Sequence, residues 1–233
     1  MSVSLKPLGI AVSLALLCAC NEPAPAAESL DAAMAADAVA EPAADHAMEA
    51  EQATAPAPQL QAAMRDLWHG HIVHTRDYAM AVHAGDDARA KAAADAVVEN
   101  AKQISGAVAG FYGEAGGDQL LTLLAGHWGA VKALTDAQAD ADQAGATAAM
   151  GDLSANAGEI ARFLASANPN LPEDAVRGML LAHGAHHNRQ IQLIMADDTA
   201  GEAAEWDAMQ THMNSIADAL AAAIAKQFPD KAS

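Results

Sequence analysis

Three of the chain's ten histidines are regularly spaced: His71, His127 and His183 follow one another at intervals of 56 residues. Neutral imidazole is the commonest protein ligand for metals, because its ring nitrogen offers a lone pair near neutral pH. Histidines that recur at a fixed interval can meet in one place if the elements that carry them also repeat. The spacing therefore predicts one site that draws a histidine from each of three segments.

A second polar series has the same interval, with Asn100, Asn156 and His212 at spacings of 56 residues. Both series lie in segments whose apolar residues recur at helical spacing. In an antiparallel pair of helices, residues equally distant from the connecting turn lie at the same height. Each residue of the two series is about 14 positions, or about 21 Å, from its turn. We therefore expect all six side chains in one layer.

The elements that must position this layer are six helices, separated by glycine, proline and aspartate. We expect them at residues 60–84, 87–111, 118–141, 146–167, 173–196 and 202–227. The predicted fold is all-α: an antiparallel up-and-down bundle of about six helices, built from three αα-hairpin repeats with a period of 56 residues. The same helices could instead stack as an open solenoid, in which the three histidines would lie in a row.

The polar layer falls on the apolar seams of these helices. Buried imidazoles and amides are costly without partners, so the layer must be hydrogen-bonded, hydrated or metal-bound. In the metal interpretation the ligands are His71, His127, His183 and His212. The residues expected to orient these ligands, or to add ligands, are Asn100, Asn156, His74, His186 and His187.

Ligation by histidine alone suits Zn(II), Cu(II), Ni(II) or Fe(II), and the affinity order does not choose among them. No Asp or Glu occupies the layer, which disfavours a carboxylate-rich di-iron site. Covalent haem is excluded because no Cys-x-x-Cys-His occurs. The alternative interpretation is a polar core layer in which His and Asn bond to one another and to trapped water, and so set the register of the bundle.

The composition agrees with a single helical domain. The 233 residues are 52% hydrophobic, which is enough for one core of ordinary size. Only 3% are aromatic and alanine dominates, which favours helix over sheet. A net charge of −18, with only 12 Lys and Arg, excludes a nucleic-acid partner, since binding a phosphate backbone needs clustered cations.

The N-terminal region is typical of a bacterial lipoprotein. Residues 1–20 have the pattern of a secretory signal, and their ending LCAC resembles a lipobox, which predicts cleavage before Cys20 and its lipidation. By resemblance to Gram-negative lipoproteins, Asn21 after this cysteine favours the outer membrane over the inner one. Residues 21–58 are rich in Ala, Pro and acids and predict a disordered tether, which leaves residues 59–233 as the helical domain. We therefore expect a protein of the cell envelope, lipid-anchored and facing the periplasm or the surface.

Four stretches carry a resemblance to a known family: LWHGHIVHTRDYAMAVHAGD, FYGEAGGDQL, NAGEIARFLASANPNLP and AIAKQFPDK. Between residues 60 and 231 the chain resembles a widespread family of small secreted or surface-anchored bacterial helical proteins that has no established activity. Members of that family carry histidine at the positions of His71, His127 and His183. The resemblance implies a histidine in each hairpin and no particular mechanism.

These observations predict an envelope lipoprotein that binds a transition metal or a small ligand at a buried His/Asn layer, for storage, sensing or delivery to a periplasmic protein. The alternative is a non-catalytic structural or interaction bundle. A third hypothesis is a metal-dependent periplasmic enzyme, which would need an open coordination position. The sequence holds no Gly-rich phosphate loop and no nucleophile elbow, so we assign no catalytic residue.

Overall fold

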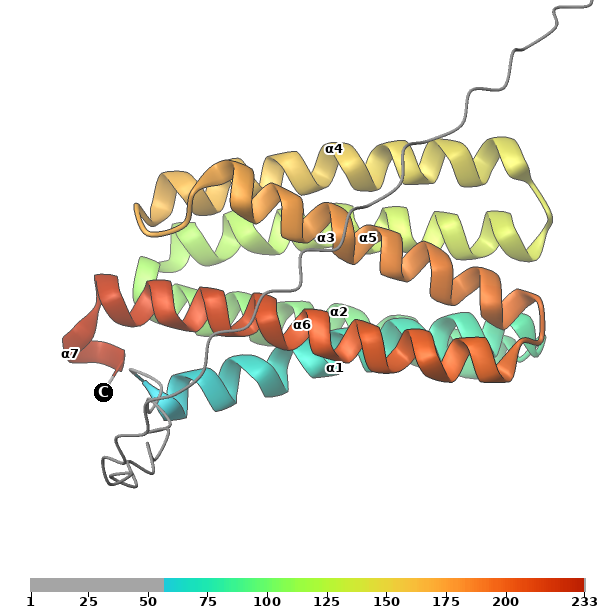
Figure 1. The fold of residues 1–233 in the computed structure, drawn as a ribbon, viewed down its shortest axis with the longest axis horizontal. Coiled ribbons are helices and arrows are strands. Elements are labelled where there is room, and N and C mark those ends of the chain that lie inside the picture. The colour runs from blue at the N-terminus through green and yellow to red at the C-terminus, as the bar shows by residue number, and fades with distance from the viewer. Residues whose placement is uncertain (1–56, 233) are drawn as a thin grey trace, which may run out of the picture. The chain divides into compact units, whose positions relative to one another are not determined.

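The computed structural model describes residues 57–232, and the expected signal sequence, Cys20 and the tether up to residue 56 lie outside this range. The described chain is all-helical, as predicted, with six long helices and a short seventh (Figure 1). These are α1 (Pro58–His83), α2 (Asp87–Tyr112), α3 (Glu114–Ala139), α4 (Gln143–Ala167), α5 (Glu173–Met195), α6 (Thr199–Gln227) and α7 (Pro229–Ala232). None of the helices in this range is long and apolar enough to cross a membrane.

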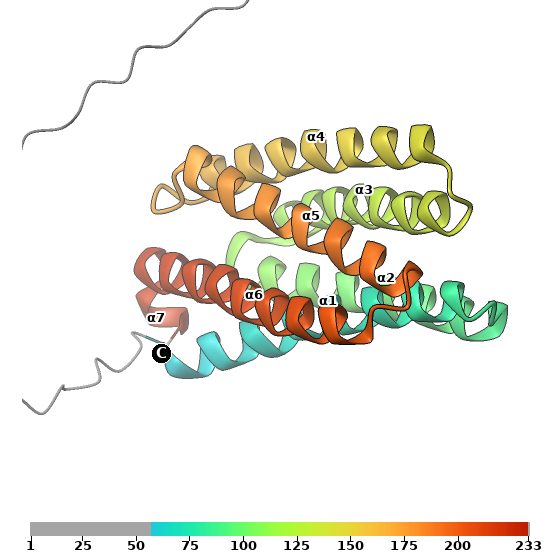
Figure 2. The same cartoon turned by 45° about the vertical axis from the view of Figure 1, so that its right-hand side comes forward.

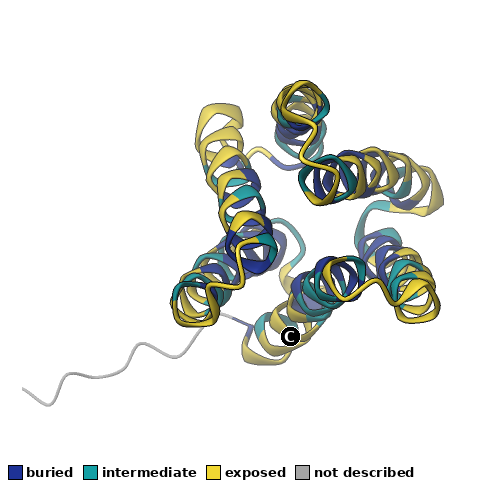
Figure 3. Ribbon diagram, turned by 90° about the vertical axis from the view of Figure 1, so that its right-hand side faces the viewer, coloured by how far each residue is buried: buried dark blue, intermediate teal, exposed yellow. Residues whose placement is uncertain are grey.

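The six long helices form a closed bundle. Each packs against its neighbours in the chain, and α6 packs against α1, which completes the ring. Helices α1, α3 and α5 also contact one another, so they are the innermost three. An end-on view shows the buried surfaces turned toward a common axis and the exposed surfaces turned outward (Figure 3). The open solenoid is therefore wrong, and the three helices that carry His71, His127 and His183 share the centre.

The three hairpin turns have the same local structure. In each turn one residue has a positive φ, and the two residues at the turn donate hydrogen bonds back to the end of the first helix, as in a Schellman motif. The following aspartate then accepts a hydrogen bond from the first turn of the next helix. The residue pairs are Gly85 and Asp86, Ala141 and Asp142, and Asp197 and Asp198. Common descent of the hairpins from one repeat stays a prediction.

Helices α3, α4 and α6 begin earlier than the sequence suggested, because glycine-containing stretches that read as loops are helical. Gly145 and Gly201 lie in the first turns of α4 and α6, where their N–H groups are hydrogen-bonded to the capping carboxylates of Asp142 and Asp198. Only one residue, Gly113, separates α2 from α3, and its φ of 82° suits glycine. The cap hydrogen bonds compensate for the low helix propensity of glycine.

Gly117 in α3 allows the close approach of α2. A Cβ atom at this position would lie 2.8 Å from Cβ of Ala109 and 2.9 Å from the carbonyl oxygen of Ser105. Because the second of these atoms belongs to the backbone, it could move only by shifting α2. Glycine at this position therefore sets the distance between the second hairpin and the first.

Two paired arginines join α1 to α6 along the seam that closes the ring. Arg65 binds both carboxylate oxygens of Asp218 at 2.7 and 2.6 Å, and Arg76 binds both oxygens of Glu202 at the same two distances. Glu202 is buried and accepts a third hydrogen bond from Gln190 of α5. A bidentate pair fixes both position and orientation. The first and last helices are therefore held in one register.

The interior divides into two halves along the bundle axis. The half near the hairpin turns is filled by one cluster that includes Tyr78, Trp128, Leu134, Leu153 and Ile194. The other half lies toward the beginning of α1 and is filled by several smaller clusters. The short α7 packs beside the end of α6 and closes this end (Figure 2). The polar layer lies between the two halves.

Candidate metal centre

Four buried histidines meet on the axis of the bundle. His71 comes from α1, His127 from α3, and His183 and His187 from α5. One ring nitrogen of each lies within 4.8 Å of the corresponding nitrogen of every other member. The side chains are at most 6% exposed, so bulk water does not reach them. We call these residues the four-histidine group.

Three members of the group form a nearly equilateral triangle. The ring centroids of His71, His127 and His183 are 5.6 to 5.7 Å apart, so each inner helix contributes one corner. The ring of His187 lies 5.8 Å from those of His71 and His127 and 4.4 Å from that of His183. The packing of three inner helices around one axis therefore brings residues that are 56 positions apart in the chain into one cluster.

His187 completes the group in place of His212. From the sequence, His187 was predicted only as an additional ligand. Its position four residues after His183 places both side chains on the same face of α5. This spacing was the sequence signal that could have placed His187 in the group. Because α5 is an inner helix, both of its histidines face the axis, whereas α6 lies farther out.

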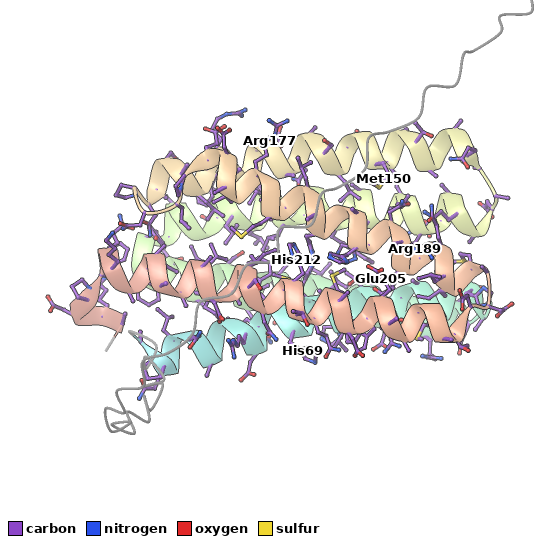
Figure 4. All side chains as sticks on the ribbon, in the orientation of Figure 1. His69, Met150, Arg177, Arg189, Glu205 and His212 are labelled. Atoms are coloured by element: carbon purple, nitrogen blue, oxygen red, sulfur yellow. The ribbon has the colours of Figure 1, made fainter. Side chains whose placement is uncertain are left out.

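His212 instead binds the backbone of the neighbouring helix. Its Nε2 lies 2.9 Å from the carbonyl oxygen of Met179, and because a carbonyl can only accept, Nε2 carries the proton. The side chain is half-buried, and its ring centroid lies 6.4 Å from that of His183. His212, which the sequence predicted as a ligand, therefore lies outside the four-histidine group and borders it from α6 (Figure 4).

The two asparagines of the layer make the same contact in the other hairpins. Nδ2 of Asn100 donates to the carbonyl oxygen of Leu67, and Nδ2 of Asn156 donates to that of Leu123, each at 3.0 Å. All three bonds of this kind span 33 residues. Each accepting carbonyl belongs to the residue four positions before a layer histidine. The second helix of every hairpin is thus fixed to the turn of the first helix that carries the histidine.

Two other histidines predicted to belong to the site, His74 and His186, lie outside the four-histidine group. His74 is half-buried and one helical turn from His71. His186 is half-buried as well, and its Nδ1 donates to Oε1 of Glu205 at 2.5 Å, a hydrogen bond that joins α5 to α6. Figure 4 places Glu205 and His212 on α6 beside α5, and the exposed His69 on α1. Both His74 and His186 were expected to enlarge the site, and neither belongs to the four-histidine group.

Several polar atoms at the centre lack hydrogen-bond partners. Among residues 57–232, no partner exists for Nε2 of His71, Nε2 of His127, Nδ1 of His183 or the side-chain oxygens of Asn100 and Asn156. The one hydrogen bond inside the group joins Nε2 of His187 to Nε2 of His183 at 3.0 Å. A buried polar atom without a partner costs about 1–3 kcal/mol, so this concentration of them is unusual for a folded core.

Burial keeps all four imidazoles neutral. It lowers the pKa of His71 from 6.5 to about 3, with the neighbouring His127 and His74 adding to the fall. It lowers the pKa of His127 to about 4, an effect that Asn156 partly offsets. The pKa values of His183 and His187 also fall well below 6.5, again mainly through burial. At neutral pH the group is therefore in the state that binds a metal, without a proton to displace.

The arrangement is close to the geometry of a four-coordinate ion. Nitrogens bound to tetrahedral Zn(II) at 2.0–2.1 Å are about 3.3 Å from one another. The nitrogens of the group lie within 4.8 Å of each other, so the imidazoles would have to move inward to hold an ion at this spacing. No carboxylate or thiolate takes part in the group that the described residues form. The residues present thus fit an ion that accepts an all-imidazole site.

Fold and site together define the class: a closed six-helix bundle with a buried four-histidine group at its centre. No protein-family model, curated protein or solved structure matches the chain. The resemblance to secreted and surface-anchored helical proteins therefore stays a prediction.

Proposed function

We propose that the protein binds one transition-metal ion on the axis of the bundle, through His71, His127, His183 and His187. The observation that carries this proposal is the meeting of four buried imidazole nitrogens within 4.8 Å of one another, where Nε2 of His71 and Nε2 of His127 have no hydrogen-bond partner among the described residues. One ion with four nitrogen ligands would satisfy them together, whereas hydrogen bonds would have to satisfy them one by one. The low pKa values support the proposal, because protons do not compete for these nitrogens at neutral pH.

Zn(II), Cu(II), Ni(II) and Fe(II) all suit imidazole ligands. Because three helices contribute ligands, the ion would hold the centre of the bundle together. Its four protein ligands would leave no coordination position open in a tetrahedral complex, which is the pattern of a retained ion rather than of a catalytic one. This favours storage, or a stabilising ion, over an enzyme.

The cellular setting of this proposal is the envelope. A lipid anchor on Cys20 and a tether that ends before α1 would hold the bundle near a membrane, from which a metal could be exchanged with a periplasmic partner. The support for this part lies in the sequence of residues 1–58.

A second candidate is a purely structural layer, and one observation favours it. The hydrogen bond between His183 and His187 is 3.0 Å long and needs no ion. If water molecules joined the other imidazoles in the same way, the layer would be a hydrogen-bond network that sets the register of the helices. The two candidates differ in one measurable quantity, the metal content.

The test compares two histidines: His187, which belongs to the four-histidine group, and His212, which lies beside it. The chain is stripped with a chelator, offered Zn(II), Cu(II), Ni(II) or Fe(II) separately, dialysed, and analysed for metal by mass spectrometry. We expect the parent to retain about one equivalent of at least one metal. We expect His212→Ala to retain it too, while His187→Ala binds it at least about 10-fold to 100-fold more weakly, since loss of even an outer partner has effects of that size.

Helical circular dichroism of both variants shows whether they remain folded. A parent that retains no metal would overturn the proposal in favour of the structural network. A folded His187→Ala variant with unchanged affinity would overturn the ligand assignment.

A further inference from the structure

A mostly apolar cavity lies in the interior of the bundle next to the four-histidine group. Its volume is about 50 Å³, and it occupies the half of the interior toward the beginning of α1. All six long helices contribute to its wall. Most of the wall is aliphatic, with Leu124, Ile160 and Ile216 as examples. The half of the core near the hairpin turns belongs to a different cluster and contributes no residue to this wall.

One end of the cavity is formed by the imidazoles. His71, His127 and His183 all line it, together with Met179 and Met213. Trp68 lines it as well; its ring packs edge-on to that of His71 at 5.9 Å, and its buried Nε1 has no hydrogen-bond partner among the described residues. An occupant would therefore touch apolar groups on most sides and the imidazole edges on one.

The volume limits what the cavity can hold. An apolar cavity of about 150 Å³ in another protein binds benzene or xenon and stays free of water. A volume of about 50 Å³ is a third of that and is too small for a ring, an acyl chain or a haem. Water is disfavoured over most of the cavity because it needs two to four polar partners, which the aliphatic wall does not offer.

We propose that this cavity is a binding site for one small uncharged apolar molecule, of the size class of xenon or a diatomic gas, held against the imidazole edges of His71, His127 and His183. The proposal does not require a metal. If the metal of the proposed function is present, the same molecule would lie beside it, which would give a buried ion contact with a gas while excluding larger ligands.

The experiment uses xenon on the metal-free chain, observed through methyl NMR signals. We expect a saturable shift of the methyl signals of Leu124, Ile160 and Ile216, which line the cavity. The methyl signals of Leu153, Ile191 and Ile194 serve as an internal control, because they lie in the cluster near the hairpin turns. Benzene, offered in the same way, should leave both sets unchanged.

Filling the cavity provides the matched variant. Val108 and Val176 line it, and Val108→Ile with Val176→Ile adds two methylene groups there. Val98→Ile adds a methylene at a position that is 43% exposed and outside the cavity. We expect the saturable xenon response to disappear in the double variant and to remain in Val98→Ile.

Three results would overturn the proposal: no saturable xenon response in the folded parent, equal responses of the two sets of methyl groups, or an unchanged response in the folded double variant. A response to benzene equal to that of xenon would overturn the size class. Because the measurement is made without metal, its outcome is independent of the metal-retention experiment.

Discussion

Nε2 of His183 and Nε2 of His187 lie 3.0 Å apart, one helical turn from each other on α5, in the centre of the bundle. One of these nitrogens must donate a proton and the other must accept it, so the accepting nitrogen cannot be protonated without loss of the bond. Two more neutral imidazoles, from α1 and α3, lie beside them. The centre of this protein is thus built from basic groups that burial keeps neutral at neutral pH.

The first prediction concerns pH. Burial lowers the pKa values of all four histidines of the group, so the unfolded chain binds more protons than the folded chain once the pH falls below about 6.5. The free energy of unfolding is therefore highest above about pH 6.5 and decreases as the pH falls toward about 4, because protonation of these histidines favours the unfolded chain. Each histidine contributes a slope of up to about 1.4 kcal/mol per pH unit.

Urea unfolding of the metal-free chain between pH 8 and pH 4 measures this slope. His127→Gln should lower the slope by up to about 1.4 kcal/mol per pH unit, the equivalent of one proton, because it removes one buried titrating group. Val98→Gln, at an exposed position without a titrating group, should leave the slope unchanged. A free energy of unfolding that is flat across this range would show that the imidazoles are not held neutral.

The second prediction concerns the contact between α2 and α3. Gly117→Ala places a methyl group 2.9 Å from a backbone oxygen, so we expect a loss of about 1–3 kcal/mol in the free energy of unfolding. Gly129→Ala in the same helix meets no atom within 4 Å and should stabilise by about 0.5–1 kcal/mol through higher helix propensity. Denaturant titrations of both variants test this pair. Equal effects of the same sign would mean that Gly117 does not set the helix spacing.

The third prediction concerns the turn between α3 and α4. Ala141 has a φ of 54°, which costs an L-residue about 1–2 kcal/mol. Glycine removes this strain, but it makes the unfolded chain more flexible, which costs about 0.4–1 kcal/mol of stability. Ala141→Gly should therefore stabilise the fold by roughly 0.5–1 kcal/mol. Ala133→Gly, at an exposed position inside α3, should instead destabilise by about 1 kcal/mol. Thermal or chemical unfolding that gave both variants the same sign would contradict the left-handed turn.

The fourth prediction concerns the seam between α1 and α6. Arg76→Gln leaves the Glu202 carboxylate, whose side chain is 7% exposed, with only the hydrogen bond from Gln190. We expect a loss of about 2 kcal/mol, somewhat less than for a fully buried pair because Arg76 itself is partly exposed. Arg65→Gln should have a smaller effect, since the Arg65 and Asp218 side chains are 46% and 33% exposed and can be hydrated. Denaturant midpoints of the two variants compare them directly, and an Arg65 effect as large as that of Arg76 would refute this ranking.

The sequence by itself determined the helices and the height of the polar layer. Helical spacing of apolar residues gave six helices, and the turn residues gave their antiparallel pairing, because both are properties of nearby residues. Equal distances from the turns were enough to group His71, His127 and His183, which the structure brings together. The sequence was less accurate about helix starts, since side-chain caps such as those of Asp142 and Asp198 draw glycines into the first turn.

Only the tertiary structure decided which histidines face each other. The closure of α6 onto α1 makes α1, α3 and α5 the inner helices, and the periodicity of a single helix carries no information on that choice. Because α5 is inside, its next turn also reaches the axis, so His187 joins the group. Because α6 is outside, His212 reaches no farther than the carbonyl of Met179. A local pattern fixes the face of each helix, whereas the distance of that face from the common axis depends on how all six helices pack.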